Sequence, residues 1–238
     1  MQTRQKAQPL DERFERRRVL ELAALAGAAL LGCSSTVQPA HPQTAKASEE
    51  GEAEVTPGED LMQEHGVLER VLLVYEEAAR RVEGSQQLDF AIVDKGAEIV
   101  RRFVEEYHER LEERFVFPRL QKAGRETALV AILLRQHERG RDVTAEIQRQ
   151  ARASAGAALA PLLRSFVRMY RPHAAYEDTL VFPAFRAVVG RGGYLELGEQ
   201  FEDEEHRLLG DHGFEGAVHE VAQLEAALGI GDLSKWTP

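Results

Sequence analysis

The segment His108-Glu-Arg-Leu-Glu-Glu-Arg-Phe-Val-Phe-Pro118 occurs a second time, with the same spacing, as His173-Ala-Ala-Tyr-Glu-Asp-Thr-Leu-Val-Phe-Pro183. Both copies follow the pattern H-x3-E-[ED]-x2-V-F-P, which is too long an agreement to expect by chance in a chain with 8 histidines. Residues four apart lie on one face of an α-helix, so each copy places an imidazole beside a carboxylate, one turn apart. The repeat therefore predicts two pairs of metal ligands, each pair on one helix.

The hydrophobic residues around the two copies predict that these ligand faces point into a core. Their helical spacing places the following residues on the ligand faces: Val100, Val104, Leu111 and Phe115 in the first copy, and Leu162, Phe166, Met169 and Leu180 in the second. A buried imidazole or carboxylate is costly unless it has a partner, and a cation shared between facing helices supplies one.

The chain between residues 60 and 186 has the composition of helices, because Ala, Leu, Glu and Arg dominate while Gly and Pro are sparse. We expect four long helices, over residues 60–81, 88–123, 126–152 and 159–188, with glycines near their ends. Each would carry one inward histidine, in order His65, His108, His137 and His173. These features predict an all-α protein: an up-down four-helix bundle over residues 60–190 and a short C-terminal helical extension over residues 191–238.

The first 33 residues differ in character from the rest of the chain. A charged region ending in Arg16-Arg17-Arg18 precedes an apolar run over residues 19–32 and the sequence Leu30-Leu31-Gly32-Cys33. This pattern resembles a bacterial lipoprotein signal that is cleaved before a lipidated Cys33. The apolar run is shorter than the roughly 20 residues that span a bilayer. The alternative is a membrane-proximal tail whose cysteine is incidental.

Residues 15–21 also resemble a twin-arginine export signal, although Glu15 and Glu21 depart from it, so general secretion stays open as the route. Residues 34–59 are rich in Ser, Thr, Pro, Glu and Ala and are expected to form a flexible acidic linker. We expect an exported, membrane-anchored lipoprotein on the periplasmic side or the cell surface, with membrane contact only through its N-terminal lipid. The net charge of −10 and the lack of a basic patch argue against nucleic acid as a partner.

The four histidine segments together resemble the hemerythrin-like (HHE) cation-binding family over about residues 60–186. The matching pieces are Gln63-Glu64-His65, the two H-x3-E copies and Arg135-Gln136-His137. The resemblance implies a non-haem di-iron centre with oxo and carboxylate bridges inside the bundle. It implies six ligands, which are His65, His108, Glu112, His137, His173 and Glu177.

The sequence departs from the oxygen-carrying members of that family in two places. Those members have a second histidine one turn beyond His137, where this chain has Arg141, and they bridge through an aspartate that would correspond to Asp178 instead of Glu177. The internal repeat favours Glu177, and Asp178 is the alternative. A fifth histidine would have to be His206, which follows an acidic run in the C-terminal extension; the alternative for His206 is a surface position.

The donor set favours iron and leaves the function between two main hypotheses. Imidazole suits iron, zinc, copper or nickel, bridging carboxylates favour a pair of hard ions, and a zinc site usually closes with four ligands. Manganese or a mixed pair stays open. The first hypothesis is a protein that binds or senses O2 or NO or handles iron, and the second is a di-iron enzyme that acts on peroxide or oxygen or donates iron for Fe–S cluster repair. A purely structural bundle is the third.

Overall fold

The computed structural model describes residues 55–237, and these residues form helices and no strand. The expected all-α fold is confirmed. The signal segment, Cys33 and nearly all of the expected acidic linker lie outside the described residues.

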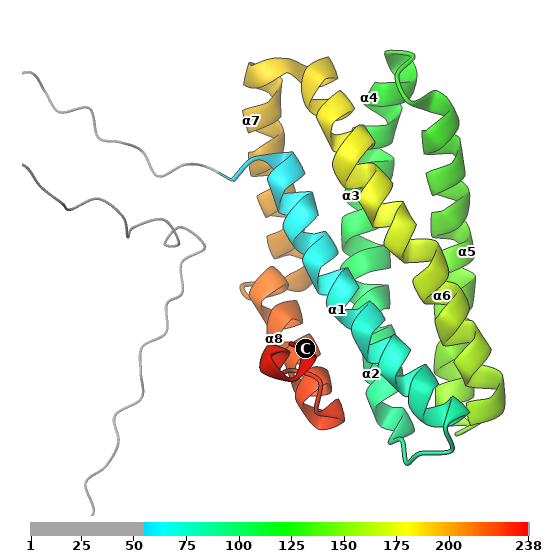
Figure 1. Cartoon of the computed structure of the whole chain (residues 1–238). Helices are drawn as coiled ribbons and strands as arrows, with labels where there is room; N and C mark the ends of the chain where they lie inside the picture. Colours follow the sequence, from blue (N-terminus) through cyan, green and yellow to red (C-terminus); the bar gives the residue numbers. More distant parts are fainter. Residues whose placement is uncertain (1–54, 238) are drawn as a thin grey trace, which may run out of the picture. The chain divides into compact units, whose positions relative to one another are not determined.

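Four long helices run up and down to form the bundle (Figure 1). The first is α1 (Pro57–Glu83), and the third is α5 (Thr127–Arg152). The second is continuous through α2 (Phe90–Ile99), η1 (Val100–His108), α3 (Glu109–Leu111), η2 (Glu112–Val116) and α4 (Phe117–Lys122). The fourth comprises α6 (Gly156–Tyr176), η3 (Glu177–Val181) and the beginning of α7 (Phe182–Leu209). These bounds agree with the expected helical ranges to within a few residues.

The chain reverses at Gly190, which has a φ of 73° inside α7. Glycine adopts this conformation without the steric cost that a side chain would bring. The remainder of α7 leads to α8 (Gly213–Leu228) and a short 3-10 turn, η4 (Leu233–Trp236). Helix α8 packs against α1 and α2 (Figure 1), and Arg70 of α1 donates two hydrogen bonds, of 2.9 and 2.6 Å, to the Glu225 carboxylate. The extension is thus attached to the side of the bundle.

The inner face of the fourth helix is only partly the face expected from the sequence. Phe166 is buried as predicted, but Leu163 and Tyr170 are buried where Leu162 and Met169 were expected, and Leu180 is 43% exposed. The expected and the observed inward faces share Phe166 and differ by one residue on either side of it, so helical spacing alone does not distinguish them. Tyr170 is accommodated in the core because its hydroxyl finds a buried partner, Glu109.

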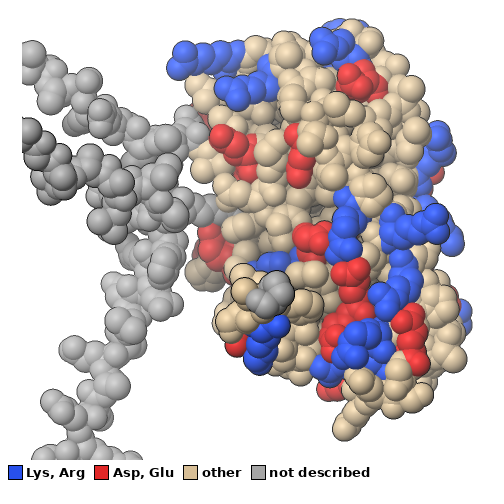
Figure 2. Space-filling view, viewed as in Figure 1, with Lys and Arg blue, Asp and Glu red and all other residues tan. Residues whose placement is uncertain are grey.

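The outer surface mixes acidic and basic side chains. Figure 2 shows them side by side on the face that carries α1 and α6, where Arg171 pairs with Glu69 and Glu76 and Arg164 pairs with Glu83. Within residues 55–237, no helix is both long and apolar enough to cross a bilayer.

Candidate metal centre

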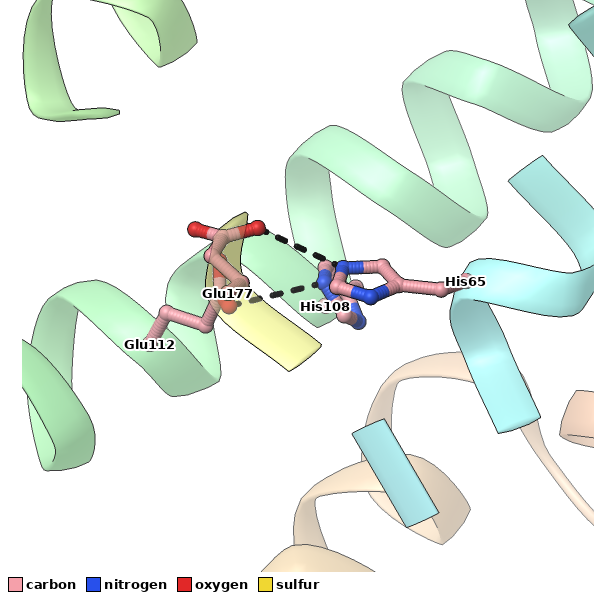
Figure 3. Close-up of side chains that lie close together, drawn as sticks. All are labelled: His65, His108, Glu112 and Glu177. Carbon is pink, nitrogen blue, oxygen red and sulfur yellow. Dashed lines mark ion pairs between the residues drawn. The ribbon is translucent and has the colours of Figure 1, made fainter. Parts of the chain in front are cut away.

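The six residues that the repeat and its partners predicted as ligands lie together inside the bundle. They form two overlapping groups: His65, His108, Glu112 and Glu177 make up one, and Glu112, His137, His173 and Glu177 make up the other. In each group one donor atom per residue lies within 4.8 Å of the others. Figure 3 shows the first group, with His65 reaching from α1 toward Glu177 and His108 beside Glu112.

The two carboxylates shared by both groups, Glu112 and Glu177, lie between the two histidine pairs. The Nε2 atom of His65 is 3.4 Å and that of His173 is 3.0 Å from Glu177 Oε2. On the other carboxylate, His137 Nε2 is 3.4 Å from Oε2 of Glu112 and His108 Nε2 is 3.7 Å from its Oε1. We call the pair His65 and His108 the first position and the pair His137 and His173 the second position. Each position has two imidazoles and access to both carboxylates.

The donor atoms are buried and several have no hydrogen-bond partner. Glu112 and Glu177 are fully buried, and both oxygens of each carboxylate, together with His65 Nε2, lack a hydrogen bond. Leaving such groups unsatisfied in a protein interior is costly. The residues therefore fit bound metal cations, which would satisfy these atoms.

The other ring nitrogen of every histidine is held by a polar side chain. His65 Nδ1 donates to Asp178 over 2.7 Å and His108 Nδ1 donates to Glu64 over 2.7 Å. In the second position, His137 Nδ1 donates to Glu113 over 3.2 Å and His173 Nδ1 donates to the Gln136 amide oxygen over 2.9 Å. A proton held on Nδ1 leaves the lone pair of Nε2 free for a metal, which is how metal-binding histidines are usually oriented.

The π-helical segments that follow the ligands have a local cause in the repeated V-F-P sequence. The carbonyls of Glu112 and Glu177 accept from the backbone N–H of Phe117 and Phe182, five residues later, in η2 and η3. The proline after each phenylalanine cannot donate a backbone hydrogen bond, and its ring crowds the carbonyl four residues before it. A wider turn relieves this crowding, and such turns are common at functional sites.

Charge among the side chains of the cluster is distributed unevenly. Burial opposes protonation of His65, but the hydrogen bond to Asp178 and the nearby charge of Glu177 prevail and raise its pKa to about 9. The pKa of Glu112 is raised, first by burial and then by repulsion from Glu177. For Glu177, burial acts upward, yet the neighbouring imidazoles of His173 and His65 hold its pKa below the usual range. A proton is thus held more readily by Glu112 than by Glu177.

Arg141 is part of a partly buried polar network behind His137. Its Nη2 donates to Glu109 over 2.8 Å and to Glu113 over 2.5 Å. Glu109 also accepts from the Tyr170 hydroxyl over 2.8 Å, and its pKa is raised by burial to about 8. The pKa of Glu113 is lowered to about 2 because its hydrogen bonds to His137 and Arg141 outweigh burial. The guanidinium charge is therefore held by two carboxyl groups next to the second position.

The structure separates the remaining candidates of the sequence from the cluster. His206 is 72% exposed, and its Nδ1 lies 3.3 Å from Asp211 instead of reaching the bundle interior. Of the two adjacent acids, Glu177 lies between the imidazoles, whereas Asp178 supports His65 from behind. The expected lipidation site, Cys33, lies outside the described residues.

The side chains that hold the histidine Nδ1 atoms are not evident from the sequence. Glu64 and Gln136 directly precede His65 and His137, yet each supports a histidine on the next helix of its own hairpin, His108 and His173 respectively. The sequence does contain a signal for two of them, because Glu64-His65 and Gln136-His137 stand at matching places in the first and third helices. The supporting role depends on a contact between helices, which spacing within one helix does not reveal.

Comparisons with known proteins agree with this geometry. Uncharacterized proteins of Mycobacterium bovis and of two strains of Mycobacterium tuberculosis are each 42% identical to this chain over 231 residues, covering 94% of it and 91% of the relative. No solved structure gives a significant match. Residues 56–185 match the Hemerythrin HHE cation binding domain, a domain that binds metal cations, typically iron. The chain therefore belongs to the hemerythrin HHE cation-binding family.

Proposed function

We propose that this protein holds two iron ions in the bundle and uses them to bind or sense O2 or NO or to handle iron. The observation that carries the proposal is that Glu112 and Glu177 are common to both ligand groups. One cation needs only one of the groups, whereas two cations make use of all six side chains. In this arrangement His65 and His108 would hold one ion, His137 and His173 the other, and both carboxylates would bridge.

Iron is the proposed metal because of the mixture of donors. Each position offers two imidazole nitrogens and carboxylate oxygens, a donor set that suits non-haem iron with coordination positions left open. A bound iron pair supplies reversible ligand binding or electron transfer at those open positions. The protein supplies the buried surroundings, the fixed imidazoles and the exclusion of bulk water.

Metal analysis of full-length protein produced in iron-rich medium, together with its absorption spectrum, tests the proposal. We expect close to two irons per chain and a charge-transfer band, and we expect His206→Ala to retain both because that side chain is exposed. His108→Ala should lose at least one iron. Less than one metal per chain in the wild-type protein after iron supplementation would overturn the di-iron proposal.

A di-iron enzyme acting on peroxide or oxygen is the second candidate, and it is favoured by the same open positions. Two histidines with a carboxylate are also the ligands of non-haem iron enzymes that activate oxygen. Steady peroxide turnover by the iron-loaded protein, lost in His108→Ala and kept in His206→Ala, would establish this candidate. A stable O2 or NO adduct without turnover would favour the binding function.

We also propose that the protein is exported and anchored through a lipid on Cys33. This part rests on the sequence of residues 1–33 alone. Metabolic labelling with an alkyne fatty acid tests it: label on the wild-type chain that disappears in Cys33→Ala supports the anchor, and an unlabelled wild-type chain refutes it.

A further inference from the structure

The two metal positions are related by the internal repeat, but the groups behind their imidazoles differ in charge. Glu64-His65 on α1 corresponds to Gln136-His137 on α5, and the second helix corresponds to the fourth. If the repeat were complete, all four Nδ1 atoms would face carboxylates. Only three do, and the one exception is in the second position.

Two carboxylates support the first position. Asp178 accepts from His65 Nδ1 and Glu64 accepts from His108 Nδ1, both over 2.7 Å. Glu64 also accepts from the Tyr107 hydroxyl over 2.7 Å, so both of its oxygens are oriented by donors. A carboxylate behind an imidazole makes that imidazole a stronger ligand for a cation.

The imidazoles of the second position have weaker carboxylate support. Gln136 offers a neutral amide to His173. Glu113 supports His137 over a longer distance, 3.2 Å, and shares the same oxygen, Oε1, with Arg141. The guanidinium thus offsets the charge of Glu113, so this carboxylate supports its imidazole less strongly than Asp178 and Glu64 support theirs.

We propose that the two positions bind metal unequally, with the first position tight and the second position weaker and exchangeable. The proposal rests on the two-metal function proposed above. The second position then loads last and empties first, so exchange of iron with the surroundings takes place at His137 and His173. The residues that set this difference are positioning residues: Asp178 and Glu64 on one side, and Gln136 and Arg141 on the other.

Anaerobic calorimetric titration of metal-free, full-length protein with Fe2+ measures the affinities of the two positions. Two steps alone are not decisive, because a first cation also repels a second from identical positions. Variants that keep one position each avoid this problem: His173→Ala keeps the first position and His108→Ala keeps the second. We expect the remaining site of His173→Ala to bind about 10–100-fold more tightly than that of His108→Ala, the range that loss of such supporting groups typically produces.

Substitutions that leave all ligands in place provide the second arm. Asp178→Asn should weaken only the first metal-binding step. Gln136→Glu should strengthen the second step, so that the two affinities become more alike. The side chains of Asp178 and Gln136 are only partly buried, so we expect the fold to tolerate these nearly isosteric changes. Circular dichroism of each variant checks this. Glu69→Gln is the matched control, since it removes a carboxylate from α1 that pairs with Arg171 at the surface.

The outcomes separate this inference from the proposed function. Equal affinities in the two single-position variants, or tighter binding by His108→Ala, would overturn the inequality while two metals still bind to the wild type. A wild-type protein that binds no second ion would instead overturn the di-iron function. A Gln136→Glu variant with an unchanged second step would show that the amide does not set the difference.

Discussion

The hydroxyl of Tyr170 lies so close to Gly140 on α5 that any side chain at position 140 is predicted to destabilise the protein. A Cβ built at Gly140 would overlap the Tyr170 hydroxyl and come within 2.8 Å of the ring carbon that bears it. Tyr170 is 1% exposed and donates a 2.8 Å hydrogen bond to Glu109, so the ring has little freedom to move away. The perturbation is Gly140→Ala, and the matched control is Gly66→Ala on α1, where a Cβ would meet nothing within 4 Å.

The structure predicts opposite signs for the two substitutions. Replacing glycine by alanine within a helix stabilises it by about 1 kcal/mol. Gly66→Ala should show this gain in full. In Gly140→Ala the ring either stays, with an overpacking cost of ~1–3 kcal/mol, or moves and loses a hydrogen bond to a carboxyl group worth ~1.5–3 kcal/mol. After the helix gain is subtracted, Gly140→Ala should be less stable than wild type by up to ~2 kcal/mol.

Urea denaturation of the metal-free proteins, followed by circular dichroism, measures both changes. The Tyr170→Phe substitution extends the test, because it removes the overlapping hydroxyl. Its cost should be smaller in the Gly140→Ala background than in the wild type, since the hydrogen bond is already lost or strained there. If Gly140→Ala stabilises the protein as much as Gly66→Ala does, the close approach and the reasoning from it are wrong.

Three further predictions concern charge. In the metal-free protein, protonated His65 contributes stability that is fully present below pH 6.5 and is lost as the pH rises through its pKa of about 9. The thermal unfolding midpoint, measured in the presence of a chelator, should therefore fall between these pH values. The fall should be smaller in Asp178→Asn, which removes the carboxylate that holds the proton on His65. Metal binding must displace protons from His65 and Glu112, so calorimetry in buffers of different ionisation enthalpy should detect proton release and tighter apparent binding toward pH 9. Arg171→Ala removes two ion pairs at the surface and should lower the free energy of unfolding by no more than ~1 kcal/mol in urea titrations.

The helices and the six clustered side chains could be predicted from the sequence because the signals are local and repeated. Helical spacing of apolar residues marks each helix, and the H-x3-E pattern puts His108 beside Glu112 and His173 beside Glu177 on the same helix. Their convergence followed from placing one inward histidine on each of four helices. The sequence alone therefore reached both the fold class and the side chains that meet inside it.

What the sequence left open depends on contacts between distant elements. Glu177 and Asp178 are adjacent acids, and only the packing of the fourth helix against α1 shows which of them lies between the imidazoles. His206 was open between a fifth histidine ligand and a surface position, and in the structure it lies beyond the reversal at Gly190 with its side chain exposed. The supporting role of Gln136 likewise appears only when α5 packs beside α6.

The two acids in H-x3-E-[ED] have different roles, and this explains why both copies keep a pair. The first acid, Glu112 or Glu177, lies between the two positions. The second acid supports a histidine of the other hairpin: Glu113 accepts from His137 on α5, and Asp178 accepts from His65 on α1. Neither hairpin can therefore orient its own ligands fully, so the metal-binding geometry depends on the two hairpins being assembled. Because a cation stabilises the state that binds it, metal binding and assembly of the bundle should reinforce each other.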